Sequence, residues 1–430
     1  WADTSNNILK MRNSANDGWI DLRTLTGGLT SAADATINSV SVGKGANSVS
    51  GNTVLGETAL DASVTGGNNT AIGLDALSDL TSGARNTSIG ADAGENITTG
   101  DDNVSVGMGT LATLTTGSNN TCLGKGSLAL ATTSSNNTAI GYDALNANTT
   151  GARNTALGST SLDANTTGEN NTAVGQQALG ANTTASGNTA VGRSALLVNT
   201  TGAANVAVGA SALDANTTAS NNTAVGHEAL SANTTGTRNV AVGSTALDAA
   251  TTANDNTAIG NNCLGLNTTG QSNTALGSDT LKSNTTANNN TAIGYAALQS
   301  NTTGASNVAV GTNALDANTT ASENTALGHE ALGANTTGTE NTAVGSHALD
   351  HNTTGQHNTA FGHNALTANT TAQNNTAIGE QALEANTTGG NNTAVGEAAL
   401  HASTTASGNT AVGYFSMLAN TTGENNTSLG

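Results

Sequence analysis

The feature that most constrains this chain is a 17-residue repeat that begins at Asn52. An Asn recurs at every seventeenth position as far as Asn426, 23 times without exception, and a Gly stands four residues after each one. Leu stands eight residues after the Asn in 20 of the 22 complete units. We number the unit from its Asn, so that Asn is position 1, Gly position 5 and Leu position 9. Such strict self-similarity is typical of a stack in which each unit is one turn.

The length of the unit selects the kind of stack. Helical-hairpin repeats take roughly 33 to 47 residues and propeller blades roughly 40 to 50, so a 17-residue unit is too short for either. One coil of a β-solenoid fits this length. We therefore predict an all-β fold, a β-solenoid (β-roll) over residues 52–430, with 22 complete 17-residue repeats and a partial one.

Each coil is predicted to hold two short strands, as in the unit "NTAIGYDALNANTTGAR" of residues 137–153. Alternation puts position 2 and the Val-type residue of position 4 on one face, and the exchange of Thr for Val at position 2 predicts that this face is buried. "AL" at positions 8 and 9 predicts the second strand, and "NTTG" a turn. The residues taken as structural constants of the coil are Asn137, Gly141, Leu145, Asn154, Gly158, Leu162, Asn171, Gly175 and Leu179.

Two glycine positions behave differently. Position 15 alternates between Gly and Ala along much of the repeat, so its conformation does not require Gly. The invariant Gly of position 5 must meet a stricter demand, which we expect to be packing against a neighbouring chain or a left-handed corner. Each coil also offers few apolar side chains to offset the ordering of a whole unit. We therefore expect lateral association of chains into an oligomer.

The residues before the repeat differ in kind. "ILKMR" and "WIDLR" are short alternating runs separated by "NSANDG", whose Asp-Gly is a turn signal, so residues 1–38 are predicted to form a β-hairpin attachment module. Residues 39–51 look like a shortened coil that caps the open edge of the solenoid.

Composition excludes several partners. The chain carries 29 acidic and 10 basic residues, a formal charge of −19, which disfavours binding to nucleic acid or to an anionic membrane. No apolar run reaches the roughly 18 residues of a membrane span, so we expect no membrane insertion. No cofactor motif is present, and we expect no cofactor.

The "NTT" tripeptides match the N-glycosylation signal, for example at Asn148, Asn165 and Asn182. The alternative is that these Asn and Thr side chains bond to the backbone of a turn and stack in ladders along the solenoid. We favour the ladder interpretation.

Other candidate groups occupy variable positions, which we assign to the outer surface. His347, His351, His357 and His363 fall within two coils but form no H-x-H pair, so we expect solvated histidines and no metal site. The carboxylates Asp143, Asp163, Glu169 and Asp316 have no predicted cleft, and we expect no catalytic residues and no enzyme activity. Cys122 and Cys263 replace small residues of the repeat and are expected to be buried thiols.

The units "NTAIG" and "NVAVG" followed by "xxAL" resemble the head repeats of YadA-type trimeric autotransporter adhesins, and still more closely the repeats of bacteriophage and other viral tail fibres. The opening "WADTSNNILKMRNSANDGWIDL" is similar to a module that precedes such tracts in phage tail proteins. The resemblance implies a parallel homotrimer that forms a fibre on the virion surface. Its N-terminal module would contact other tail proteins, and a region outside this chain would bind the host receptor.

Two other functions stay open at this point. A cell-surface adhesin, whose repeat surface itself binds a host or matrix partner, would use the same fold in an extracellular setting. An ice-binding solenoid is suggested by Thr columns, although the adjacent Thr residues of "NTT" would point to opposite sides of an extended segment.

Overall fold

The computed structural model describes residues 2–3, 8–12, 19–22 and 34–430. The chain divides into two units, residues 1–125 and residues 126–430, and each is considered by itself. Both are built from β-strands, with a 3-10 turn at Ala46–Ser48 among the described residues. The predicted all-β solenoid with an N-terminal hairpin is confirmed.

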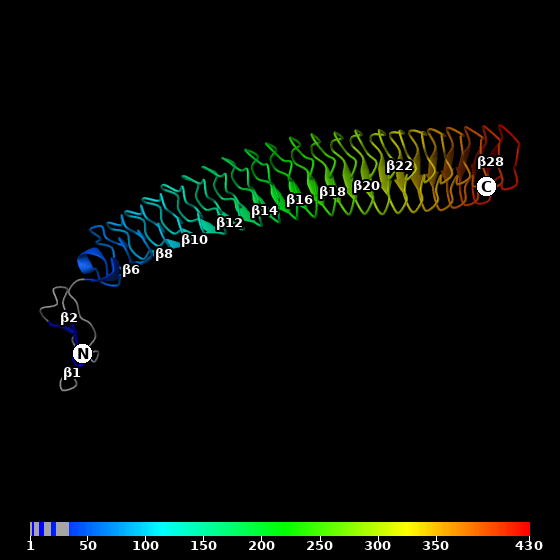
Figure 1. Cartoon of the computed structure of the whole chain (residues 1–430). Helices are drawn as coiled ribbons and strands as arrows, with labels where there is room; N and C mark the ends of the chain where they lie inside the picture. The colour runs from blue at the N-terminus through cyan, green and yellow to red at the C-terminus, as the bar shows by residue number, and fades with distance from the viewer. Residues whose placement is uncertain (1, 4–7, 13–18, 23–33) are drawn as a thin grey trace. The chain divides into compact units, whose positions relative to one another are not determined.

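The repeat contributes one strand per coil, and Figure 1 shows these strands stacked in chain order within each unit. The strands are β1 Ala2–Asp3, β2 Ile8–Arg12, β3 Trp19–Leu22, β4 Ala35–Ile37, β5 Val40–Gly43, β6 Thr53–Gly56, β7 Thr70–Ile72, β8 Thr87–Ile89, β9 Val104–Val106, β10 Thr121–Leu123, β11 Thr138–Ile140, β12 Thr155–Leu157, β13 Thr172–Val174, β14 Thr189–Val191, β15 Val206–Val208, β16 Thr223–Val225, β17 Val240–Val242, β18 Thr257–Ile259, β19 Thr274–Leu276, β20 Thr291–Ile293, β21 Val308–Val310, β22 Thr325–Leu327, β23 Thr342–Val344, β24 Thr359–Phe361, β25 Thr376–Ile378, β26 Thr393–Val395, β27 Thr410–Val412 and β28 Thr427–Leu429.

The strands of the repeat pair in parallel and in register. β6 to β10 form such a ladder in the first unit, and β11 to β28 form one in the second. Thr138 lies opposite Thr155 and Ala139 opposite Ala156, so each position of the coil stacks on itself. At a strand spacing of about 4.8 Å, the 18 strands of the second unit extend over about 80 Å.

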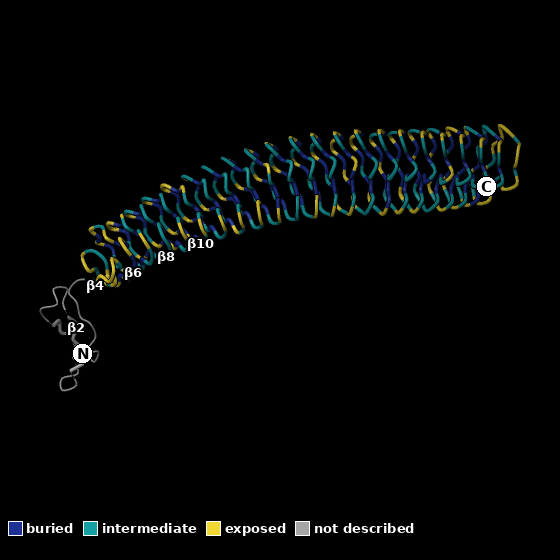
Figure 2. The backbone as a smooth tube through the Cα atoms, in the orientation of Figure 1, coloured by how far each residue is buried: buried dark blue, intermediate teal, exposed yellow. Residues whose placement is uncertain are grey.

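The interior of each coil is lined by small and amide side chains. Figure 2 colours the buried residues dark blue, and they recur from coil to coil. In the coil of residues 137–153 the buried residues are Asn137, Ala139, Ala144, Leu145, Asn148 and Gly151. Within the strand, Ala139 points inward while Thr138 and Ile140 point outward and are partly exposed. The prediction that positions 2 and 4 are buried is therefore wrong. The alternation holds, but the small residue of position 3 takes the inside.

The return path of the coil contains no second strand in the part that the structure describes, so the predicted strand at "AL" is also wrong. Leu145 and Leu162 lie within turns and have φ values of 55° and 52°, in the left-handed region. Positions 7 and 17, such as Asp143 and Arg153, are left-handed as well. Alternation of left- and right-handed residues folds the chain tightly, which lets each short unit close one narrow coil.

The return path still bonds to the next coil. The Leu145 amide donates to the Ser161 carbonyl at 2.9 Å, and the Thr149 amide donates to the Thr166 carbonyl at 2.9 Å. Coil-to-coil backbone bonds therefore hold the turns as well as the strand. They satisfy buried amides that would otherwise destabilise such a thin structure.

The invariant Gly of position 5 has a reason within the chain. Gly141 has φ 140°, and a Cβ on it would lie 2.4 Å from the carbonyl oxygen of Gly158, its equivalent in the next coil. Gly158 and Gly175 have φ values of 141° and 132°. Such values are essentially restricted to Gly, and the backbones stack too closely for a side chain. The expected left-handed φ is found, and the close packing is against the next coil of the same chain.

The first edge of the ladder is covered by an antiparallel hairpin. β4 pairs with β5, and β5 runs antiparallel to β6. Asp34 fixes the turn, because its carboxylate accepts hydrogen bonds from the Lys44 and Gly45 amides at 2.7 and 2.6 Å. Residues 39–51, predicted as a shortened capping coil, contain β5 and the 3-10 turn. Pairing of this kind removes the exposed edge that a parallel ladder presents.

The predicted N-terminal hairpin is present. β2 and β3 pair antiparallel, with Leu9 opposite Leu22, and β1 adds to β2 to give the order β1-β2-β3. The Asp-Gly turn signal at residues 17–18 lies outside the described residues.

Candidate functional site

One exposed feature recurs in every coil. It is the outward side of the strands, formed by the side chains of positions 2 and 4, and we call it the strand face. Position 2 is Thr in 19 coils and Val in four, and position 4 is Val, Ile, Leu or, once, Phe. Leu157, Leu327 and Phe361 are 44%, 47% and 57% exposed. No charged residue occupies either position in any coil. The strand face is therefore an uncharged, largely apolar strip that follows the ladder.

The predicted Asn constants form a buried ladder. Asn137, Asn154 and Asn171 are at most 1% exposed. The backbone amide of Asn154 donates to Oδ1 of Asn137 at 2.9 Å, and that of Asn171 donates to Oδ1 of Asn154 at 3.0 Å. Nδ2 of Asn154 donates to the Gly168 carbonyl at 2.8 Å. Each Asn satisfies a buried amide and a buried carbonyl at once, which explains why no other residue replaces it.

Position 12 forms a second amide ladder in the second unit. Asn148, Asn165 and Asn182 are fully buried, and Nδ2 of each later Asn donates to Oδ1 of the preceding one at 2.8 Å. Nδ2 is the atom to which a glycan would be attached, and here it also donates to the position 15 carbonyl, as in Asn148 to Gly151 at 2.9 Å. A sugar at these residues would replace buried hydrogen bonds of the coil.

The remaining constants pack the interior. Leu145, Leu162 and Leu179 are fully buried and take the same position in successive coils, so they stack in one column. The left-handed backbone at each Leu turns its side chain inward. Leu therefore provides nearly all the bulk of the core, and Ala fills the space beside the strands.

The carboxylates considered from the sequence lie on the outer side of the turns. Glu169 forms an ion pair with Arg153 of the preceding coil. Partial burial raises the pKa of Asp163 and of Asp316, since desolvation disfavours the charged form. The hydroxyl of Tyr142 donates a hydrogen bond to Asp143, which raises the pKa of that tyrosine. These acids occupy positions 7, 10 and 16, away from the strand face.

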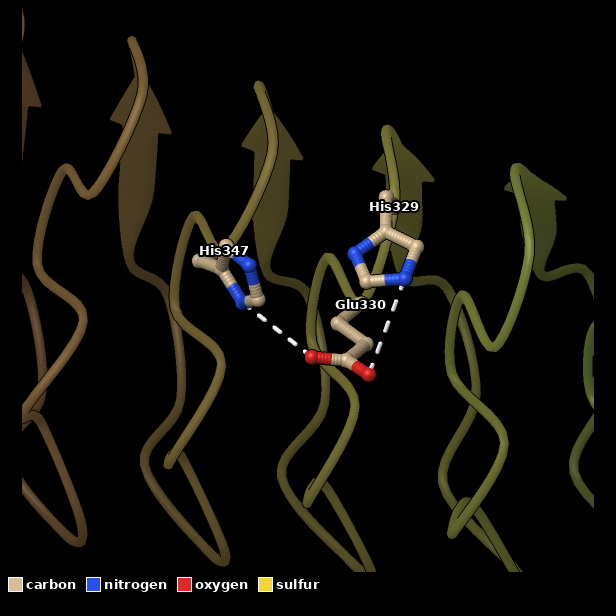
Figure 3. Close-up of side chains that lie close together, drawn as sticks. All are labelled: His329, Glu330 and His347. Carbon is tan, nitrogen blue, oxygen red and sulfur yellow. Dashed lines mark ion pairs between the residues drawn. The ribbon is translucent and has the colours of Figure 1, made fainter.

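The structure gathers some of the histidines and separates others. His347 lies beside His329 and Glu330, as Figure 3 shows, with the two imidazole centres 5.3 Å apart. His363 is a more distant neighbour of His347, at 6.5 Å. His357 pairs instead with Glu340, its Nε2 lying 3.2 Å from the carboxylate.

The sequence interpretation missed His329 and Glu330 as partners of His347. The signal was available, because His329 and Glu330 occupy positions 6 and 7 of one coil and His347 occupies position 7 of the next. Residues one period apart stack directly in this fold, so side chains at the same or adjacent positions of successive coils come into contact. Linear clustering instead pointed to His351 and His357, which lie at positions 11 and 17.

Both cysteine side chains are buried, as expected. Burial raises the pKa of the Cys263 thiol to about 12, and its Sγ lies 3.3 Å from the Ala275 carbonyl oxygen, to which it donates. A thiol with this pKa is unreactive near neutral pH.

Among the described residues, no helix has the length and apolar character needed to cross a membrane. No protein-family model matches the chain, and no curated protein matches it either.

Proposed function

We propose that this chain is the solenoid shaft or head of a virion fibre, most simply a phage tail fibre, in which three parallel copies associate through the strand face. The fibre would hold a receptor-binding tip away from the particle for attachment to a host. The observation that supports this proposal is the uncharged strand face, which follows the parallel ladder coil after coil. The resemblance of the repeat to tail-fibre sequences supplies the setting.

The strand face has the properties of a surface between copies of one chain. Monomeric proteins rarely expose contiguous apolar patches larger than a few hundred Å². Here Leu157 and Leu327 are nearly half exposed, and the position 4 side chain is half-buried or exposed in every coil. Copies that share one period can repeat every contact along their length when they lie parallel. A cyclic arrangement then closes the interface without leaving a free face.

The distribution of charge agrees with this arrangement. The formal charge of −19 would oppose association if carboxylates met at the interface. Positions 2 and 4 carry none, and the acids lie at turn positions such as those of Asp143, Asp163 and Glu169. Three chains can therefore approach through their strand faces while their acidic turns stay in water.

Sedimentation equilibrium on the full chain tests the proposal. We expect a trimer for the wild type, and monomers for a variant with Leu157→Glu, Val191→Glu and Val225→Glu, because three charges would be buried in each copy. The matched control places the same charges on exposed position 14, as Thr150→Glu, Thr167→Glu and Thr201→Glu, and should remain trimeric. A well-folded wild-type monomer would refute the proposed association. If the chain is a trimer, immunogold microscopy of virus particles and of cell surfaces distinguishes a virion fibre from a cell-surface adhesin.

One observation favours ice binding as a second candidate. The structure places the position 2 Thr side chains on the outward side of a parallel ladder, about 4.8 Å apart. A regular Thr array of this kind is what an ice-binding face requires, although position 4 supplies Val, Ile or Leu and not a second Thr. Thermal hysteresis measured on the purified chain distinguishes the two functions. Ice binding predicts hysteresis, and the fibre proposal predicts none.

A further inference from the structure

We propose that His329, Glu330 and His347 form a binding site for a divalent transition-metal ion of the zinc class. The site lies on the turn side of two successive coils of the second unit, where the period of the repeat brings the three side chains together (Figure 3). This inference rests on the local geometry and does not depend on the fibre proposal.

The spacing of the three side chains suits a metal. Nδ1 of His347 lies 3.2 Å from one Glu330 oxygen, Nε2 of His329 lies 3.7 Å from the other, and the three ligand atoms all fall within 4.8 Å of one another. Bonds of about 2.0 to 2.1 Å at tetrahedral angles separate neighbouring ligands by about 3.3 Å. The 3.2 Å separation already matches this value. The 3.7 Å separation involves the other Glu330 oxygen, so modest rotation of the surface side chains is needed to bring both imidazoles to one carboxylate oxygen.

The ligand types select the metal. Two imidazoles and one carboxylate are the donors that zinc and its neighbours in the first transition row accept, whereas magnesium and calcium prefer oxygen alone. The side chains of His329, Glu330 and His347 are 50%, 35% and 34% exposed, so solvent reaches the site and a water molecule can occupy the open position. Asp350, whose carboxylate lies 3.2 Å from Nδ1 of His347, adds a second negative charge beside it.

The charge of this region favours a cation. No Lys or Arg follows Lys282, while residues 283–430 contain nine acidic residues and six of the seven histidines. A divalent ion would offset this excess of negative charge, which no lysine or arginine balances in this part of the chain.

The chain contains its own control. His227 and Glu228 repeat the pair formed by His329 and Glu330, with the same 3.7 Å separation between Nε2 and the carboxylate. In the following coil Ser244 corresponds to Ser346 and Asp248 to Asp350. Only the third ligand differs. Thr245 occupies position 7 of the coil after His227 and Glu228, whereas His347 occupies position 7 of the coil after His329 and Glu330. The earlier pair should therefore bind metal weakly, and Thr245→His should convert it into a second site.

Isothermal titration calorimetry of the full chain with zinc chloride, in a buffer that does not bind zinc, tests the proposal. We expect one tight equivalent per chain for the wild type and for His227→Gln, at least a tenfold loss of affinity for His329→Gln and His347→Gln, and two equivalents for Thr245→His. Circular dichroism checks that each variant is folded, which their surface positions favour. Titration with magnesium chloride should give no binding heat.

Cobalt provides an independent readout, because a tetrahedral cobalt site absorbs strongly in the visible range. We expect this absorption in the wild type and its loss in His347→Gln. The proposal is overturned if His347→Gln binds zinc as the wild type does, or if Thr245→His adds no equivalent in a folded protein.

Discussion

Ala250 interrupts the position 12 ladder, and this interruption leads to a sharp prediction. On one side the ladder runs through Asn216 to Asn233, and on the other it resumes at Asn267. Oδ1 of Asn233 is buried and has no hydrogen-bond partner, because Ala250 in the next coil offers no donor. We expect Ala250→Asn to stabilise the solenoid by completing the ladder.

The magnitude follows from the bonds of an intact stretch of the ladder. By analogy with Asn182, whose Nδ2 donates to Asn165 Oδ1 at 2.8 Å and to the Ala185 carbonyl at 3.1 Å, an Asn at position 250 would donate to Asn233 and to the Ala253 carbonyl. It would also accept from Asn267. Three bonds at about 1 kcal/mol each, less about 1 kcal/mol for ordering the new side chain, give about 2 kcal/mol.

Hydrogen exchange is the suitable assay, because long repeat arrays need not unfold in one cooperative step. A gain of about 2 kcal/mol corresponds to roughly 30-fold slower exchange, and we expect it at the amides of residues 233–267 and not in distant coils. Ser403→Asn repairs the second interruption, beside the unpaired Oδ1 of Asn386, and should behave alike. Conversely, Asn335→Ala should create a new gap and accelerate exchange locally. Unchanged or faster exchange in folded Ala250→Asn would refute the ladder account.

The remaining predictions concern the backbone, the acids and the thiol. Gly141→Ala should lower the free energy of unfolding by at least about 2 kcal/mol in denaturant titration. Gly187→Ala should lower it by only about 1 kcal/mol, since Ala204 already occupies the equivalent left-handed position with φ 56°. Equal effects of the two substitutions would contradict the steric explanation. Partial burial raises the folded-state pKa of four position 10 aspartates, so the folded state binds more protons and stability falls as pH rises through that window. The melting temperature should accordingly increase from pH 7 towards pH 4, and replacing the four by Asn should flatten the increase; they are Asp163, Asp214, Asp248 and Asp316. In a Cys122→Ala background, a thiol reagent at pH 8 should leave Cys263 unmodified until denaturant is added, because a pKa of about 12 leaves about one thiolate in 10⁴; rapid labelling of the native protein would disprove this.

The coil could be predicted from the sequence because stacking of equivalent residues imposes a fixed 17-residue period on the chain. A residue that stacks on its own equivalent in every coil must meet the same demand each time, so Asn137 and Gly141 reveal themselves through invariance. The physical cause of that invariance needed coordinates. The side chain of Asn137 bonds to backbone groups of two coils, and neither bond can be inferred from composition.

The strand face was assigned to the wrong side because the exchange of Thr for Val at position 2 was taken as a sign of burial. A better guide was size. Position 3 holds only Ala, Ser, Cys and Val, whereas position 4 accepts residues from Val to Phe361. A narrow interior restricts volume, and tolerance of Phe marks the outside. The left-handed Leu of position 9 could not have been foreseen, because Leu has no local preference for positive φ.

The candidate metal site could have been found from the sequence by comparing positions within the coil. His329 and His347 belong to successive coils and are 18 residues apart in the chain, but they become neighbours once positions 6 and 7 are stacked. The distances to Glu330 depend on side-chain rotamers and required the structure.

Stacking each position on its own equivalent has a consequence for how such a gene can change. Deletion or duplication of one full period, wherever it starts within the repeat, rejoins an Asn column, a Leu column and a Gly column in their original order. Deletion of part of a period shifts every later coil out of alignment with the earlier ones. The number of residues in the solenoid can therefore change by whole coils. Recombination between the near-identical repeats lengthens or shortens the solenoid, and every coil still makes the same contacts with its neighbours.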